Sequence, residues 1–468
     1  MAEAQTLSER YWPRIRPFTV CAIGLLILVS VIRWGGTARP GPLFVAGVAL
    51  IIGVLVLFGL LGYWLYGSPL PDHVVIPQPG HPEVRRMLAL FVPISGLLFA
   101  GGGMWDEAWH LRYGSFGDDF LWPPHFLMYS SLGMIALFAA GVMIMLLRGG
   151  DLRARFRADP LIGMIGLMAA LLVISLPTDQ IWHAIYGVDL TAWSLPHIWI
   201  VVGLSLVMFS AMALQLSFVP PAGWRTLVGL RWSEVLIFVL MVPAMIALLQ
   251  LGVTEWGRIT EIPTQASADS FRAAFWNRPE PLFPIVVSVL ALFCSNLVLH
   301  TTRRVGAATV VAVTVALFRT AAATLMAGFD GTWVVVASYW LIIPAAIALD
   351  LWYASRLRSA ETTRTLMLGN VIASSVLLAV TLPFIMLTMV YPRVNAATLP
   401  WMIIGSLLMG VISGWAGARG GDWMASRERL DVHAEAVPAR TRWAATATGA
   451  LALVYALAVI LTARPPTA

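Results

Sequence analysis

The sequence predicts an all-α polytopic membrane protein, and three observations carry this prediction. Of the 468 residues, 59% are hydrophobic and only 12% are charged, whereas soluble domains have about 25% charged residues. The apolar residues form long runs, and one helix needs about 20 residues to cross a bilayer. These runs lack the alternation of apolar and polar residues that is typical of β-barrel strands. Each run must therefore form its backbone hydrogen bonds within a helix. A water-soluble enzyme is therefore excluded.

The apolar runs predict about thirteen transmembrane helices with short connections. In chain order they cover residues 17–33, 42–66, 87–110, 124–147, 160–186, 196–218, 233–252, 284–301, 305–327, 332–354, 365–391, 397–417 and 443–462. We divide the chain into three parts. Residues 1–86 hold two spans and a proline-rich loop, residues 87–218 hold four spans, and residues 219–468 hold a seven-span bundle.

The basic residues predict the orientation. The net charge of +6 comes from 30 basic residues, all of them arginine. With the N-terminus in the cytoplasm and the C-terminus outside, 21 arginines lie on the inner side and eight on the outer side, as the positive-inside rule requires. The arginines thus predict membrane orientation and no nucleic-acid partner. Arg319 lies inside the ninth span, where we expect it to pair with a carboxylate such as Glu255 or with an anion.

The third to sixth spans carry a duplicated polar motif. Asp, Trp, His, Tyr, Gly, Trp, Pro and His recur in the same order, at an offset of about 72 residues. The first copy supplies Asp106, His110 and His125, and the second supplies Asp179, His183 and His197. Each copy ends one helix and begins the next, which predicts a parallel repeat of two helical hairpins at spans 3–4 and 5–6.

Each copy can bring one carboxylate and two imidazoles together. Asp106 and His110 are four residues apart and share a helix face, and His125 follows a proline in the first turn of the next helix. This ligand type suits copper, iron(II), zinc or manganese and leaves coordination positions for water, dioxygen or substrate. The alternative interpretation is that these side chains cap helix ends, beside tryptophans that form an interfacial belt.

Other polar residues have less distinctive patterns. Four acidic residues flank the motif, and we interpret them as solvated loop charges, with extra metal ligation as the alternative: Glu107, Asp118, Asp119 and Asp189. Asn296 and Asn370 are interpreted as hydrogen-bonding residues between helices. Asp350 lies too far toward the inner end of its span to pair with Arg319, and His300 receives no role.

The motif resembles the metal site in the C subunit of the copper membrane monooxygenases, the particulate methane and ammonia monooxygenase family. The resemblance covers residues 104–200 and rests on the spacing of the Asp and His residues. It implies that Asp106, His110 and His125 match one copper site and that Asp179, His183 and His197 match its neighbour. Asp179 stands where that family has asparagine.

The expected function is an oxidoreductase in which one or two copper ions, with iron or zinc as alternatives, activate dioxygen toward a small apolar substrate. The chain would lie in the bacterial cytoplasmic membrane, with its metal sites on the extracytoplasmic side. Its expected partners are lipid, an electron donor, and other membrane or periplasmic subunits. The alternatives are metal transport or delivery, which predicts polar residues leading inward from the sites, and lipid-linked glycosyl transfer using Asp118 and Asp119.

Overall fold

The computed structural model describes residues 53, 56–76, 82–113, 122–147, 150–186, 195–216, 218–219, 223–257, 282–327, 333–355, 363–388, 394–425 and 439–464. These residues form helices and no β-strand. The helices are α3 (Pro82–Tyr113), α4 (Pro123–Leu147), α5 (Leu152–Ala158), α6 (Pro160–Tyr186), α7 (Leu195–Leu216), α8 (Trp232–Gly257), α10 (Leu282–Thr302), α11 (Ala307–Ala322) with the π-helical turn η2 (Ala323–Ala327), α12 (Trp333–Trp340), α13 (Ile342–Ala354), α14 (Thr363–Thr388), α15 (Leu399–Ala425) and α16 (Ala439–Thr462).

The helices have the length and composition of membrane spans. Within the described residues, seven segments are long and apolar enough to cross a bilayer, and they comprise α6, α7, α10, α11 with η2, α12 with α13, α14 and α15. Shorter apolar helices cover Val56–Tyr66, Glu234–Gln250 and Thr446–Thr462. The chain is thus an integral membrane protein. Each predicted span from 42–66 onward overlaps a described helix, whereas span 17–33 lies outside the described residues.

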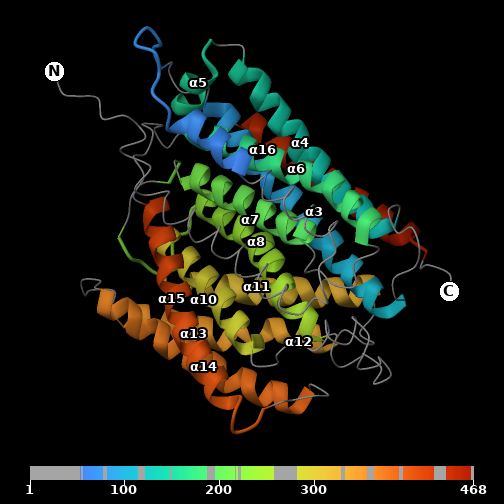
Figure 1. Cartoon of the computed structure of the whole chain (residues 1–468), viewed down its shortest axis with the longest axis vertical. Coiled ribbons are helices and arrows are strands. Elements are labelled where there is room, and N and C mark those ends of the chain that lie inside the picture. The colour runs from blue at the N-terminus through green and yellow to red at the C-terminus, as the bar shows by residue number, and fades with distance from the viewer. Residues whose placement is uncertain are drawn as a thin grey trace.

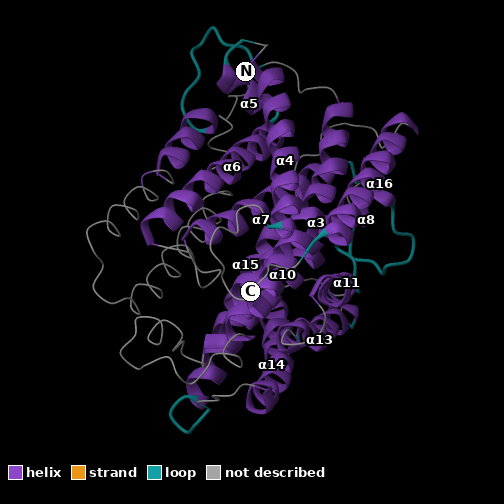
Figure 2. Ribbon diagram, turned by 90° about the vertical axis from the view of Figure 1, so that its right-hand side faces the viewer, coloured by secondary structure: helices purple, strands orange, loops and turns teal. Residues whose placement is uncertain are grey.

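The helices divide into two groups that α8 joins. Helices α3, α4, α6 and α7 pack as neighbours, and α10, α11, α13, α14 and α15 pack as a second group. Figures 1 and 2 show α4, α5 and α6 at one end of the molecule and α13 and α14 at the other. The last helix, α16, lies against α3 and α4. It therefore packs on the hairpin that carries the first copy of the motif.

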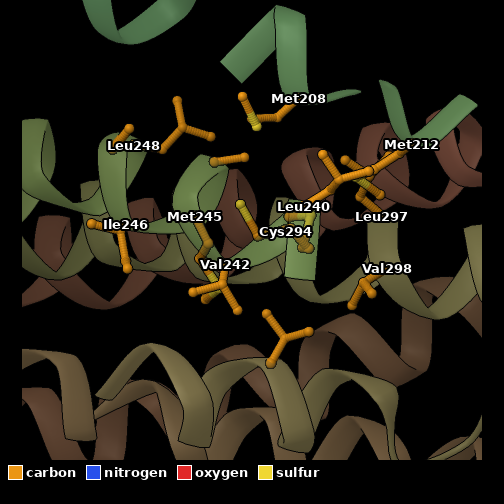
Figure 3. Packing of buried hydrophobic residues seen from close by; sticks show 14 of the residues in the cluster. Met208, Met212, Leu240, Val242, Met245, Ile246, Leu248, Cys294, Leu297 and Val298 are labelled. Carbon is orange, nitrogen blue, oxygen red and sulfur yellow. The ribbon is translucent and has the colours of Figure 1, made fainter. Parts of the chain in front are cut away.

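The interface of α7, α8 and α10 is apolar. Figure 3 shows Leu240 and Met245 of α8 beside Cys294 of α10, with Met208 and Met212 of α7 on one side of them. All five side chains are fully buried. Because methionine is flexible and polarisable, it fills the irregular spaces where three helices meet.

Small residues set the contact between α10 and α15, the most extensive between two helices here. A Cβ atom at Gly421 would lie 2.7 Å from the carbonyl oxygen of Leu297. A Cβ atom at Gly417 would overlap the carbonyl oxygen of Phe293. Glycine at these positions lets two backbones approach as closely as they do in small-residue contacts between membrane helices.

Arginines on the predicted inner side anchor loops. Asp151 caps the N-terminus of α5 by accepting hydrogen bonds from the backbone N–H groups of Arg153, at 2.8 Å, and Ala154. A further bond from the Arg153 guanidinium lowers the pKa of the Asp151 carboxyl below its usual value. The buried Arg157 donates to the carbonyl oxygens of Leu65 and Ser68. It thereby satisfies groups at the end of the apolar helix before α3.

A second buried arginine fixes the loop before α8. Arg304 donates to both carboxylate oxygens of Glu234, at 2.9 and 2.8 Å, and to three loop carbonyl groups between residues 226 and 229.

Asp350 accepts hydrogen bonds from the backbone N–H of Gly306 and of Thr309, at the start of α11. Asp350 thus bonds to a helix N-terminus, in agreement with the prediction that it does not pair with Arg319.

Candidate metal centre

The first copy of the motif brings its carboxylate and its second histidine together. Asp106 lies near the C-terminal end of α3, and His125 is the third residue of α4, after Pro123 and Pro124. The His125 Nε2 atom lies 3.0 Å from Asp106 Oδ1. Both side chains are mostly buried, with 14% and 21% of their surface exposed. The helix contact between α3 and α4 therefore joins two residues that are far apart in the sequence.

The second copy repeats this pairing at a longer distance. Asp179 lies near the C-terminal end of α6, and His197 is the third residue of α7. Their Nε2 and Oδ1 atoms are 3.8 Å apart. The His197 side chain is 34% exposed, more than twice the fraction of His125. The two copies thus share one arrangement, in which the first pair is closer and its histidine is less exposed, while Asp106, at 21%, is slightly more exposed than Asp179, at 16%.

The remaining predicted ligands are placed only in part. His110 and His183 each follow their aspartate by four residues on a continuous helix, so backbone geometry puts both residues of a pair on one face. The side chains of His110 and His183 lie outside the described part of the chain. Asp118, Asp119 and Asp189 also lie outside it. Among side chains that are described, no group of three or more His, Cys, Asp or Glu residues lies close enough to hold a metal ion.

The distance within the first pair is compatible with one ion bound by both side chains, whereas the 3.8 Å of the second pair is longer than either geometry below. Metal bonds to imidazole nitrogen and carboxylate oxygen are about 2.0–2.2 Å long. Two such donors at right angles around one ion are then about 3.0 Å apart, and at a tetrahedral angle they are about 3.4 Å apart. The Asp106–His125 separation of 3.0 Å matches the first geometry. It also matches an ordinary hydrogen bond, so the distance permits both interpretations.

No protein-family model, no curated protein and no solved structure matches this chain. Its function is therefore argued from the residues and their geometry.

Glu107 corrects one prediction, because it is a buried ion-pair partner and not a solvated loop charge. Its two carboxylate oxygens accept hydrogen bonds from the Arg319 guanidinium, at 2.6 and 3.1 Å. Glu107 is 6% exposed and Arg319 is 1% exposed. The expectation that Arg319 pairs with a carboxylate is thus confirmed, with Glu107 as that carboxylate, while the side chain of Glu255 lies outside the described residues. The ion pair ties α3, next to Asp106, to α11.

The tryptophans of the first copy also correct a prediction. Trp105, Trp109 and Trp122 are buried and do not form an exposed aromatic belt. Trp109 packs edge-to-face against both of the others, with ring centroids 5.2 and 5.9 Å apart. Apolar residues of α16, among them Val459 and Ile460, pack against this cluster. The three rings therefore brace the end of the hairpin that holds Asp106 and His125.

His300 forms contacts that the sequence interpretation missed. Its Nδ1 atom lies 3.1 Å from Asp422 Oδ1, and its Nε2 atom lies 2.7 Å from the Tyr353 hydroxyl oxygen. Trp224 stacks on Tyr353, with ring centroids 4.6 Å apart, and meets His300 edge-on. One signal was available in the sequence, because Asn296 and His300 are four residues apart and share one face of a mostly apolar helix. The partners of His300 come from other helices, and spacing cannot identify them.

Proposed function

We propose that this chain is a membrane metalloprotein that holds one or two copper ions at Asp106, His110 and His125 and at Asp179, His183 and His197, with iron or zinc as alternatives. The observation that supports the proposal most is the approach of His125 Nε2 to Asp106 Oδ1 at 3.0 Å. The corresponding pair in the second copy repeats this approach at the longer distance of 3.8 Å. Helix caps bond to backbone groups, whereas here carboxylate and imidazole approach each other twice.

The reaction that we propose is the activation of dioxygen toward a small apolar substrate. Copper or iron in such a set would supply the redox change, because three protein ligands leave coordination positions open. The protein holds the aspartate and histidine on two packed helices, and Glu107 with Arg319 fixes the end of α3. An apolar bundle gives a lipid-soluble substrate an approach through the membrane. The resemblance to the copper membrane monooxygenases supports the same reaction.

We further propose that the sites face the extracytoplasmic side of a bacterial cytoplasmic membrane. The arginine distribution supports this orientation. An electron donor is required, and it would be a separate component such as a membrane quinol or a partner subunit.

Metal transport is the alternative, and the polar side chains on the inward side of the first site weaken it. Ser95 and Ser131 hydrogen-bond to each other between α3 and α4, at 3.0 Å. Gln250 donates to the carbonyl oxygen of Gly103 at 2.8 Å. These groups bond to their neighbours and do not form a row of metal ligands. Lipid-linked glycosyl transfer rests on Asp118 and Asp119, and no described contact favours it.

Metal analysis of purified protein tests the proposal. Protein supplied with copper and iron should retain one or two ions per chain, and paramagnetic resonance should identify copper(II) with nitrogen ligands. We expect His125→Ala and His197→Ala each to lower the metal content and the double variant to lose the metal. His73→Ala changes an exposed loop histidine and serves as the matched control. Wild-type protein without transition metal, or a double variant that keeps its metal, would refute the proposal.

A further inference from the structure

Helices α10, α14 and α15 meet along a line of polar side chains that the proposed metal sites do not use. We call this line the polar seam. It consists of Ser288 and Asn296 of α10, Asn370 and Ser374 of α14, and Ser406 of α15. Each of these residues is at least 96% buried. The sequence presented them as scattered polar residues, and helix packing gathers them into one place.

The glycines of α15 show that these polar groups converge. A Cβ atom at Gly410 would overlap Ser374 Oγ and would lie 3.4 Å from Ser288 Cβ. One turn later, a Cβ atom at Gly414 would lie 2.5 Å from Asn370 Oδ1 and 2.7 Å from its Nδ2. Side chains of α10 and α14 thus meet over the same glycine strip of α15.

The hydrogen-bonding capacity of the polar seam is mostly unused within the protein. Asn296 Nδ2 donates to Asn370 Oδ1 and to the Leu292 carbonyl oxygen, both at 2.8 Å, which confirms the predicted bond between helices. Five buried atoms of the seam have no hydrogen-bond partner among the described residues: Ser288 Oγ, Asn296 Oδ1, Asn370 Nδ2, Ser374 Oγ and Ser406 Oγ. An unsatisfied polar group at membrane depth is costly.

Two hydroxyl groups on helix faces outside the seam behave differently. Ser375 on the exposed face of α14 donates to the Val371 carbonyl oxygen at 2.8 Å, and Thr314 of α11 donates to that of Val310 at 2.8 Å. A hydroxyl on an apolar helix usually bonds to the backbone one turn earlier in this way. The three seam serines do not, so their hydroxyl groups need partners within the seam.

The polar seam continues toward the end of α15. His300 lies one turn after Asn296 on α10, and its Cβ atom would contact a Cβ atom at Gly421. His300 is fully buried, yet its Nδ1 atom lies 3.1 Å from Asp422 Oδ1. The Asp422 side chain is 34% exposed. The line of polar groups thus runs from the interior of the bundle to an accessible carboxylate.

We propose that the polar seam binds ordered water molecules in the centre of the bundle. The five atoms include an amide oxygen that accepts, an amide nitrogen that donates, and hydroxyl groups that do both. A cation would leave the Asn370 nitrogen without a partner, and an anion would leave the Asn296 oxygen without one. Water satisfies both kinds of group, as it does at other buried polar sites. The proposal does not depend on the metal sites.

Hydroxyl-radical labelling by X-ray radiolysis tests the proposal in intact protein in lipid nanodiscs, since radicals form where water is bound. Leu292 lies in the seam, 3.1 Å from a Cβ atom placed at Gly410. Leu240 lies in the apolar interface of α7, α8 and α10 that Figure 3 shows, and both leucines are fully buried. We expect Leu292 to be oxidised several-fold faster than Leu240. Equal oxidation rates of Leu292 and Leu240 in the wild-type protein would overturn the proposal.

Variants test whether the serines hold this water. Replacing Ser288, Ser374 and Ser406 together by alanine should lower Leu292 oxidation several-fold toward the Leu240 rate. Ser375→Ala removes a hydroxyl group outside the seam and should leave the Leu292 rate unchanged. An unchanged Leu292 rate in a folded triple variant would also count against the proposal. If the triple variant does not fold, the wild-type comparison still decides.

Discussion

At the scale of single residues, two aspartates of the same motif differ in their surroundings. Asp106 lies 3.0 Å from its histidine and Asp179 lies 3.8 Å from its own. The second histidine is also the more exposed of the two. In the proposed metal sites, the pair whose donors already lie closer together should contribute more to metal affinity, so the two sites should respond unequally to the loss of charge.

We therefore expect Asp106→Asn to weaken copper binding more than Asp179→Asn. The Asp106 change should lower affinity by at least about tenfold, which is the lower limit for losing even an outer partner of a metal ligand. Asparagine has the same shape, so each change removes charge and little else. Competition titration against a chelator of known affinity measures both variants. Equal losses would show that the two pairs are equivalent in the metal-bound protein.

Glu107 and Arg319 form a buried ion pair whose partners depend on each other. Arg319→Met should destabilise the protein by about 3–5 kcal/mol, because it leaves the Glu107 carboxylate buried without its partner. The double variant Glu107→Leu with Arg319→Met should recover most of that loss, since no buried charge remains. Denaturant unfolding in detergent measures both. A double variant as unstable as the single one would show that packing, and not charge, is the main contribution.

At the scale of helices, the close approach of α10 and α15 depends on glycine at a few positions. Gly417→Ala places a methyl group against the Phe293 carbonyl oxygen, so the helices must separate. We expect a loss of about 1–3 kcal/mol, as for other overpacked interfaces. Gly133→Ala in α4 is the matched control, because nothing lies within 4 Å of its Cβ position. Thermal unfolding distinguishes them, and equal melting temperatures would contradict this account of the contact.

Helix α5 shows how helix packing exceeds what periodicity predicts. The boundaries of α6, α7 and α10 follow closely from their apolar runs, because length and hydrophobicity define a membrane helix. The short helix α5 was not predicted, since its seven residues carry three arginines and lie in a predicted loop. Its position depends on Asp151 at its N-terminus and on Arg157 bonded to a distant helix end.

At the scale of the whole molecule, one apolar core runs from Leu65 to Met424 and includes α7, α8, α10 and α15. The proposed metal ligands sit on helices that contribute to this core. A ligand that binds only the folded state stabilises it by about 2.7 kcal/mol at a hundredfold excess over its dissociation constant. Metal occupancy and global stability should therefore change together.

We expect added copper to raise the melting temperature of the metal-free wild-type protein and a chelator to reverse the increase. The His125→Ala and His197→Ala double variant should show no increase. Scanning calorimetry in detergent measures both proteins, and the His73→Ala control should respond as the wild type does. An increase of the same size in the double variant would place copper binding elsewhere in the chain.

The sequence predicted two of the contacts at the candidate site, and the membership of the full site stays a prediction. Duplication and spacing identified Asp106 with His125 and Asp179 with His197, and both pairs lie within 4 Å. Spacing succeeded because a helical hairpin relates the end of one helix to the start of the next. Sequence spacing did not predict the ion pair of Glu107 and Arg319, because these residues are separated by 212 residues in the chain.

The sequence by itself determined that this chain enters a membrane as helices, because lipid offers no hydrogen-bond partners and each apolar run must satisfy its own backbone. It also determined which residues recur at the ends of the two hairpins. Only the tertiary structure decided which buried polar groups meet, such as Glu107 with Arg319, His300 with Asp422, and the members of the polar seam. Those contacts depend on the rotation and depth of helices that are distant in the chain, and local hydrophobicity encodes neither.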